Sequence, residues 1–201
     1  ILDGTFASEI TPITVKGRKR ETVFDTDERP MDTDMDKMGR LRPAFKKDGS
    51  VTAGNASGIN DAAAAVLLMS ADMAQQLALD PIVKIKAFAA GGVDPAYMGL
   101  GPVPAVRKVL KAVGMTIDGV DMIELNEAFA AQAIGCMREL GIPTEQPNEL
   151  GSGISLGHPI GCTGARQVVT GMYQMQRQGY ATGLVTMCIG GGMGMAMLLE
   201  R

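Results

Sequence analysis

The sequence predicts an α/β fold in which a mostly parallel sheet is flanked by helices. From residue 80 onward, short apolar segments typical of strands alternate with helical segments of about ten to twenty residues. Glycines directly follow the predicted helices at Gly114, Gly141 and Gly179, where a helix commonly ends in a left-handed residue. Together these two observations favour helices packed on the faces of a sheet.

The predicted elements follow one another in a simple order. Residues 1–50 lack core periodicity, apart from a strand-like segment at 10–15, and their acidic part at 25–36 is expected to be surface loop. A helix is predicted at 62–77, capped by Asn60 or Asp61. Further strands are predicted at 82–89, 121–125, 184–188 and 194–199, with helices at 104–113, 127–140 and 161–178.

Composition limits the classes of function. The chain has 46% hydrophobic and 20% charged residues with a net charge of −3, which favours a globular protein over a disordered one. A pI near 5.2 provides no positive field for general nucleic-acid binding. The longest apolar run, 62–69, is too short to span a bilayer, and the chain opens without a signal peptide, so no membrane partner is expected.

Three cysteines, Cys136, Cys162 and Cys188, are an odd number without C-x-x-C spacing. A disulfide framework and a structural zinc site are therefore not expected, and no metal site is predicted. Free thiols favour a reducing compartment, which we expect to be the cytoplasm.

Asn126 and Glu127 directly follow a predicted apolar strand and open a predicted helix. Asn126 has two interpretations. It caps the helix, which is the commonest role of asparagine at such a position, or it belongs to a site, because sites in α/β sheets gather where strands end. Glu127, in the first turn, would interact favourably with the helix dipole in either case.

His158 is the only histidine of the chain and stands before Pro159, a residue suited to the first helical position. The positive end of a helix would disfavour the imidazolium form, so that a neutral ring could act as a base. A structural or surface histidine is the competing interpretation. The flanking Gly157 and Gly161 would let a substrate approach the backbone.

Cys188 ends a predicted buried strand and precedes the glycine run 190–192. One interpretation is a small hydrophobic residue followed by a hairpin turn. The other is a thiol that handles a proton beside backbone N–H groups that hold an oxyanion. No Gly-Lys-Ser/Thr follows the run, so a nucleotide-binding P-loop is not supported.

In this order, Asn-Glu-Ala-Phe at 126–129, Gly-His-Pro-Ile-Gly at 157–161 and Cys-Ile-Gly-Gly-Gly at 188–192 resemble the C-terminal signatures of the thiolase family. The similarity extends over the whole chain, including 41–45 and 52–58. The ending Gly-Met-Gly at 192–194 most resembles the biosynthetic acetoacetyl-CoA branch, while the broader β-ketoacyl-CoA branch stays open.

The resemblance implies a domain organisation. Residues 1–59 would end the thiolase loop domain, 60–79 would form the last helix of the N-terminal domain, and 80–201 would form a βαβαβαββ C-terminal domain with a mixed sheet. None of the three cysteines matches the acyl-carrying cysteine of the family. The first half of a thiolase, with that cysteine, is therefore expected as a partner.

The resemblance also implies catalytic roles. His158 would activate the acyl-carrying cysteine and, with a water held by Asn126, stabilise an enolate oxygen. Cys188 would take the α-proton of the second acyl-CoA, and the N–H of Gly190 would join the oxyanion hole. Carbon–carbon bond formation needs such a set: a covalent acyl donor, a base and oxyanion donors.

Substrate contacts follow from the same resemblance. Ser57 and Ala53 would line the pantetheine channel, with Met98 and Phe129 at its apolar end. Arg29, or the basic run 16–20, would meet the nucleotide end. Residues 148–153 depart from the Asn-x-Asn-Gly-Gly stretch that thiolases often carry, which affects the loop beside His158.

The implied function is reversible condensation of two acetyl-CoA molecules to acetoacetyl-CoA and CoA, with no cofactor besides the CoA thioesters as substrates. A homodimer or homotetramer is expected. The alternatives are a degradative 3-ketoacyl-CoA thiolase and a non-catalytic CoA-binding subunit. A ketosynthase-like enzyme is disfavoured because that class typically uses two histidines and this chain has one.

Overall fold

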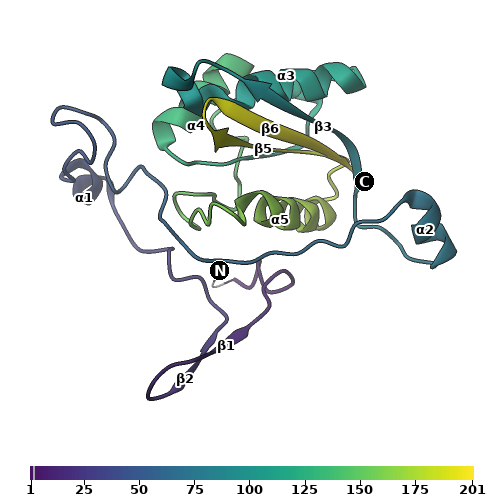
Figure 1. Cartoon of the computed structure of the whole chain (residues 1–201), viewed down its shortest axis with the longest axis horizontal. Coiled ribbons are helices and arrows are strands. Elements are labelled where there is room, and N and C mark those ends of the chain that lie inside the picture. The colour runs from purple at the N-terminus through teal and green to yellow at the C-terminus, as the bar shows by residue number, and fades with distance from the viewer. Residues whose placement is uncertain (2) are drawn as a thin grey trace.

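A four-stranded mixed sheet forms the centre of the computed structural model, which describes residue 1 and residues 3–201 (Figure 1). The strands lie in the order β3 (Lys84–Gly92), β6 (Met193–Glu200), β5 (Thr182–Gly190) and β4 (Met122–Leu125). β6 pairs antiparallel with both β3 and β5, and β4 pairs parallel with β5.

The prediction of a mostly parallel sheet is therefore wrong, whereas the mixed sheet and the α/β class implied by the resemblance are confirmed. The physical reason lies in the connection between the last two strands. Only residues 191–192 separate β5 from β6, which is too short for a parallel crossover and requires a hairpin.

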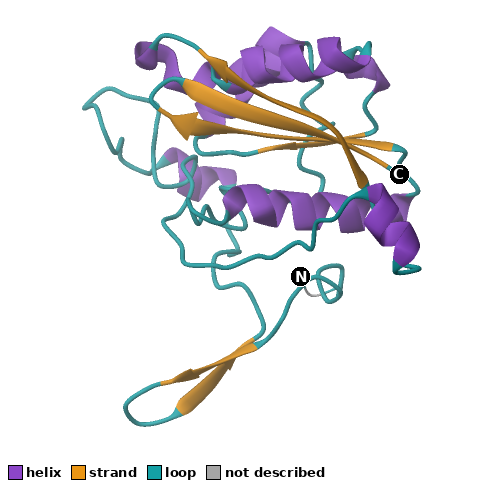
Figure 2. Cartoon of the chain, turned by 45° about the vertical axis from the view of Figure 1, so that its right-hand side comes forward, coloured by secondary structure: helices purple, strands orange, loops and turns teal. Residues whose placement is uncertain are grey.

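Helices cover both faces of the sheet. The helices α3 (Pro102–Val113) and α4 (Ala130–Leu140) lie on one face and α5 (Thr163–Gln178) on the other (Figures 1 and 2). The short 3₁₀ helices η1 (Pro95–Leu100) and η2 (Ile117–Gly119) flank α3. The larger hydrophobic core fills the space beneath α3 and α4, and a smaller methionine-rich core includes Met122 and Met175 of β4 and α5.

The glycine signals for helix ends are confirmed. Gly114, Gly141 and Gly179 follow α3, α4 and α5 with φ of 70°, 72° and 72°, in the left-handed region that glycine adopts without steric cost. The helices begin less predictably than they end. The predicted helices 127–140 and 161–178 start at Ala130 and Thr163, because residues 126–129 and 157–162 are used in loops.

The element order differs from βαβαβαββ at one place. Residues 141–162, all of which the structure describes, form no strand between α4 and α5. Two isolated parallel bridges stand there instead, Ile123 with Pro147 and Ile59 with His158, and the first lies at the edge of β4. Beside it, Asn148 bonds β4 with its side chain: Oδ1 accepts from Leu125 N–H at 2.9 Å, and Nδ2 donates to Leu125 C=O at 2.8 Å. One side chain thus completes the free edge of β4.

The segment before the sheet is irregular. β1 (Ile13–Lys16) and β2 (Glu21–Phe24) form a hairpin that projects from the body (Figure 2), and α1 (Met35–Gly39) is one short helix. The helix predicted at 62–77 is wrong over 62–70. Only α2 (Ala71–Gln76) forms, capped by Ser70, whose side chain accepts from the N–H of Met73.

The physical reason is the lack of a packing partner. Leu67 and Leu68 are 83% and 67% exposed, so the apolar face of a longer helix would have nothing to pack against. Other large apolar side chains are exposed as well, including Phe45, Ile59, Phe88 and Ile160. Among the described residues, no helix has the length and apolar character needed to cross a bilayer.

We predict that Asn148→Gly destabilises the chain by roughly 2–4 kcal/mol, because the N–H and C=O of Leu125 lose their partners. Asn148 has φ of 60°, so Asn148→Ala should cost about 1–2 kcal/mol more through backbone strain. Chemical denaturation measures both values. Ala78→Gly, at φ of 51° on the surface, is the control for strain alone and should not destabilise. If Asn148→Gly were as stable as the wild type, this would contradict the role of Asn148 in completing the edge of β4.

Candidate active site

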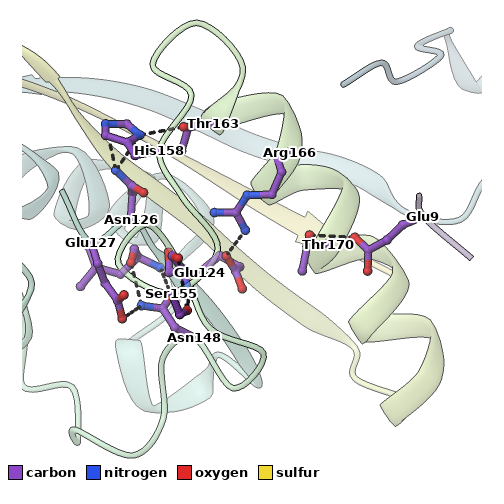
Figure 3. Close-up of polar contacts among 12 residues, drawn as sticks. Glu9, Glu124, Asn126, Glu127, Asn148, Ser155, His158, Thr163, Arg166 and Thr170 are labelled. Atoms are coloured by element: carbon purple, nitrogen blue, oxygen red, sulfur yellow. Dashed lines mark hydrogen bonds and ion pairs between the residues drawn. The ribbon is translucent and has the colours of Figure 1, made fainter. Parts of the chain in front are cut away.

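Asn126 and His158 meet at the carboxyl end of β4. The backbone N–H of Asn126 donates to Thr186 C=O of β5 at 3.0 Å, which continues the parallel ladder by one residue. Its side-chain Nδ2 lies 3.5 Å from each ring nitrogen of His158 (Figure 3). The helix-cap interpretation is wrong, because Phe129 occupies the N-cap position of α4 and Asn126 stands three residues earlier.

Besides Asn126, three contacts hold His158. Its backbone N–H donates to Oδ1 of Asn60 at 3.2 Å, and Ile59 forms a parallel bridge with it. Its ring Nδ1 lies 2.7 Å from Oγ1 of Thr163, the first residue of α5. His158 thus stands five residues before the helix, at its approach rather than in its first turn.

The pKa of His158 is lowered, as expected, but the main cause differs from the prediction. Burial of the ring disfavours the charged form, and the positive charge of Arg166 adds to this. The helix end was the predicted cause. In both accounts the ring stays neutral near neutral pH and can accept a proton.

Cys188 lies in β5, the strand next to Asn126. Thr186 is paired with Leu125, so Cys188 stands two residues farther along β5, at the same carboxyl edge of the parallel pair. Its side chain is half-buried, and burial raises the pKa of the thiol. A neutral thiol is thus the prevailing form near neutral pH.

The glycine run after Cys188 forms the β5–β6 hairpin, as one interpretation predicted. Gly190, Gly191 and Gly192 have φ of 104°, 60° and 87°, and the register shifts between Cys188 and Gly190. At Gly192 a side chain would also collide with the backbone of Val93. Gly190 is exposed at the last position of β5.

The predicted substrate-contact residues fall into two groups. Ser57 and Phe129 lie near each other, because Ser57 N–H donates to Ala128 C=O at 3.0 Å and Ala56 bridges Phe129. Arg29 joins this group, since its Nη2 lies 3.4 Å from Ala56 C=O.

Ala53 belongs to the turn 52–55, which lies beside this group, because Asn55 C=O accepts from Ala130 N–H at 2.9 Å. Met98 is half-exposed in η1, which packs on α4. The basic run 16–20 lies at the tip of the projecting hairpin (Figure 2). Two cavities of the described chain, one lined by 80–84 and 179–181 and one near the N-terminus, include none of the predicted site residues.

Sequence reasoning missed a buried ion pair beneath the site. Glu124 is fully buried, and Arg166 Nη1 lies 3.3 Å from its Oε2. Burial raises the pKa of Glu124 to about 7, although Arg166 opposes the shift. The signal was present in the sequence: a carboxylate inside the apolar strand Met-Ile-Glu-Leu needs a buried partner.

Glu127 and Thr163 also have positions that the sequence did not reveal. Glu127 is not in a first helical turn, so the predicted dipole interaction is wrong. Its carboxylate accepts from Asn148 Nδ2 at 2.9 Å and from Ile154 N–H at 3.4 Å, which fastens the loop 148–154 beneath Asn126. Thr163 contacts the ring of His158, and the only sequence signal for this contact is its position shortly after His158.

Family models agree with this geometry. Residues 79–201 match the thiolase C-terminal domain and residues 1–72 match the thiolase N-terminal domain. The chain belongs to the thiolase family.

Known thiolases resemble the chain throughout its length. The acetyl-CoA acetyltransferase of Syntrophomonas wolfei is 55% identical over 100% of this chain and 51% of its own. The beta-ketoadipyl-CoA thiolase of Pseudomonas aeruginosa is 48% identical over 98% of this chain and 50% of its own. The thiolase chain described here therefore spans about half the length of the curated relatives it matches. These relatives are acyltransferases, so the family is one of enzymes.

Solved structures show the same fold. The Bacillus anthracis acetyl-CoA acetyltransferase superposes with a TM-score of 0.97 at 47% identity, covering 99% of this chain and 51% of that one. Human mitochondrial 3-ketoacyl-CoA thiolase superposes with a TM-score of 0.91 at 36% identity, covering 99% and 51%. The thiolase fold is thus shared across both branches.

We predict that Glu124 makes this thiolase chain more stable at mildly acidic pH. Its pKa of about 7 in the folded chain exceeds the usual 4.5, so between these values the folded state binds more protons and stability falls as pH rises. Relative to Glu124→Gln, the wild type should lose about 2–3 kcal/mol between pH 5 and pH 8.

Urea unfolding of both proteins at several pH values measures this difference. The comparison removes most of the contributions of His158, whose lowered pKa acts in the opposite direction, and of Glu9, whose raised pKa acts in the same direction. Parallel pH profiles for the two proteins would contradict the assignment to Glu124.

Proposed function

We propose that the chain is the C-terminal part of an acetyl-CoA acetyltransferase. It would catalyse the reversible condensation of two acetyl-CoA molecules to acetoacetyl-CoA and CoA, with the nucleophilic cysteine supplied by a thiolase N-terminal half. The observation that carries the proposal is the approach of Asn126 to the ring of His158, beside the strand of Cys188. An amide, an imidazole and a thiol at one sheet edge suit two successive proton transfers.

In the proposed first step, His158 takes the proton of the acyl-carrying cysteine as its sulfur attacks acetyl-CoA. The proton then passes to the departing CoA thiolate, which leaves an acetylated cysteine. A neutral imidazole is required, and burial with the charge of Arg166 keeps His158 neutral.

In the second step, the thiolate form of Cys188 removes the α-proton of another acetyl-CoA and becomes a neutral thiol. The enolate attacks the acetyl carbonyl, and the sulfur of the acyl-carrying cysteine leaves and takes the proton that Cys188 received. The imidazole with a water on Asn126 stabilises the enolate oxygen, and Gly190 N–H stabilises the oxyanion on the acetyl group. In the cleavage direction Cys188 returns its proton, which suits a thiol whose raised pKa keeps it protonated.

The proposal extends to substrate contacts and assembly. A human mitochondrial 3-ketoacyl-CoA thiolase, 35% identical to this chain, is described in complex with CoA, which supports CoA thioesters as the substrates. Ser57, Ala53, Met98, Phe129 and Arg29 are the proposed contacts. The exposed apolar surface supports an assembly with the N-terminal half and a homodimer or homotetramer.

We also propose the domain division 1–59, 60–79 and 80–201, as the end of the loop domain, the end of the N-terminal domain and the C-terminal domain. The middle segment retains only the helix α2 of the long helix expected there. The three free cysteines are consistent with a cytoplasmic location.

A degradative thiolase is the second candidate. It is favoured by the beta-ketoadipyl-CoA thiolase at 48% identity and by the human 3-ketoacyl-CoA thiolase fold. Comparison of acetoacetyl-CoA with longer 3-ketoacyl-CoA substrates distinguishes the two candidates. The first predicts a preference for acetoacetyl-CoA, and the second predicts cleavage of the longer substrates at least as fast.

We predict that the chain becomes active when joined to the N-terminal half of the Syntrophomonas wolfei enzyme. In this chimera, Cys188→Ala should lower CoA-dependent cleavage of acetoacetyl-CoA by about 10²–10⁴-fold, since a proton-transfer group is lost, with CoA affinity nearly unchanged. Stopped-flow absorbance and CoA titration measure the two quantities.

Cys136→Ala is the matched control, because this thiol is buried and bonded to Gly99 C=O and should be dispensable for turnover. Full activity in Cys188→Ala would refute the catalytic role. A folded chimera that binds CoA without any turnover would instead favour the non-catalytic CoA-binding subunit.

A further inference from the structure

Thr163 forms two hydrogen bonds with its hydroxyl group at the start of α5. The side chain is fully buried, and Oγ1 lies 2.9 Å from Pro159 C=O and 2.7 Å from Nδ1 of His158. Figure 3 shows the imidazole between Thr163 on one side and Asn126 on the other. The hydroxyl has one proton, and which neighbour receives it determines the protonation of the ring.

The carbonyl of Pro159 is the receiver. It lies four residues before Thr163, and donation from a threonine hydroxyl to the carbonyl four residues earlier is a recurrent bond at helices. With its proton on Pro159, Oγ1 has only lone pairs to offer His158. The short contact to Nδ1 is then a bond in which Nδ1–H donates to Oγ1.

The contact with Asn126 is compatible with this assignment. Nδ2 of Asn126 is a donor, and it lies 3.5 Å from both ring nitrogens. If Nδ1 carries the hydrogen, Nε2 has a free lone pair and can accept from Nδ2. The assignment itself rests on the two bonds of Thr163, because the two distances to Asn126 are equal.

We propose that Thr163 is a positioning residue that fixes His158 in the Nδ1–H tautomer and leaves Nε2 as the nitrogen that exchanges protons. The tautomer is a property of this chain and needs no substrate. Its catalytic consequence rests on the proposed function.

That consequence concerns both proposed steps. When Nε2 takes the proton of the acyl-carrying cysteine, the imidazolium keeps its Nδ1–H bond to Thr163, so the ring need not turn. That proton leaves with the CoA thiolate, and when Nε2 carries a proton again in the second step, the same orientation lets Nε2–H donate to the enolate oxygen. One orientation of the ring serves as base and as oxyanion donor, which is what a preorganised site requires.

The test uses the single histidine of the chain. Residues 1–201 are prepared with ¹⁵N-labelled histidine, and long-range proton–nitrogen correlation spectra identify which ring nitrogen carries hydrogen. At a pH where the ring is neutral, we expect Nδ1 to be protonated and Nε2 to be unprotonated. Free histidine favours the opposite tautomer, so this result is diagnostic.

Variants attribute the tautomer to the hydroxyl. Thr163→Ser keeps an oxygen at the same place and should retain the Nδ1–H signal, whereas Thr163→Val should lose it in favour of Nε2–H or a mixture. Thr170→Val is the matched control: its hydroxyl is also buried on α5 but bonds Glu9 at 2.7 Å, so the His158 spectrum should not change.

The wild-type spectrum decides the proposal even if Thr163→Val does not fold. An Nε2–H tautomer in the wild type overturns it, and so does identical behaviour of folded Thr163→Ser and Thr163→Val. In the chimera, Thr163→Val should lower kcat by about 10- to 100-fold with KM nearly unchanged, as for other groups that orient a histidine. A chimera without any activity would refute the proposed function and leave the tautomer result intact.

Discussion

The imidazole of His158 is hydrogen-bonded from two sides, and these bonds join the end of β4 to the start of α5. Asn126 approaches from the strand and Thr163 from the helix, at 3.5 Å and 2.7 Å. Each partner is fully buried and leaves the ring few other orientations. Asn60 fixes the backbone of the same residue from a segment almost a hundred residues away. The position of His158 therefore depends on three separate parts of the chain.

Charges beneath the site support this arrangement. Arg166 pairs with the buried Glu124 two residues before Asn126, and its positive charge also disfavours imidazolium at His158. Glu127 fastens the loop that contains Asn148. Buried ion pairs add little net stability because desolvation offsets their attraction. Here the ion pair instead holds the carboxyl end of β4 in a fixed position.

Local signals in the sequence predicted much of the fold. The glycines after the helices were reliable because a left-handed C-terminal residue is a local requirement, and the three signature segments indicated the family. The relative direction of the strands could not be predicted from such local signals, because it depends on the two-residue connection between β5 and β6. The prediction of a helix at 62–77 was wrong for a related reason, since most of its apolar residues have no packing partner within the described chain.

The site was predicted in part. The structure brings Asn126 and His158 together and places Cys188 on the adjacent strand, yet Asn126 is not the helix cap that its sequence position favoured. Thr163 and Arg166 were not identified from the sequence. Their roles depend on the short loop after Pro159, which sets where α5 begins and which side chains face the sheet.

The central claim is that His158 and Cys188 serve different proton transfers on an acyl group carried elsewhere. Mass spectrometry of the intact chimera after mixing with acetyl-CoA tests it most directly, because it detects the acetylated cysteine. We expect Cys188→Ala to become acetylated at nearly the wild-type rate and His158→Ala to be slower by about 10²–10⁴-fold. Acetylation of His158→Ala at the wild-type rate, or its absence in Cys188→Ala, would contradict the account.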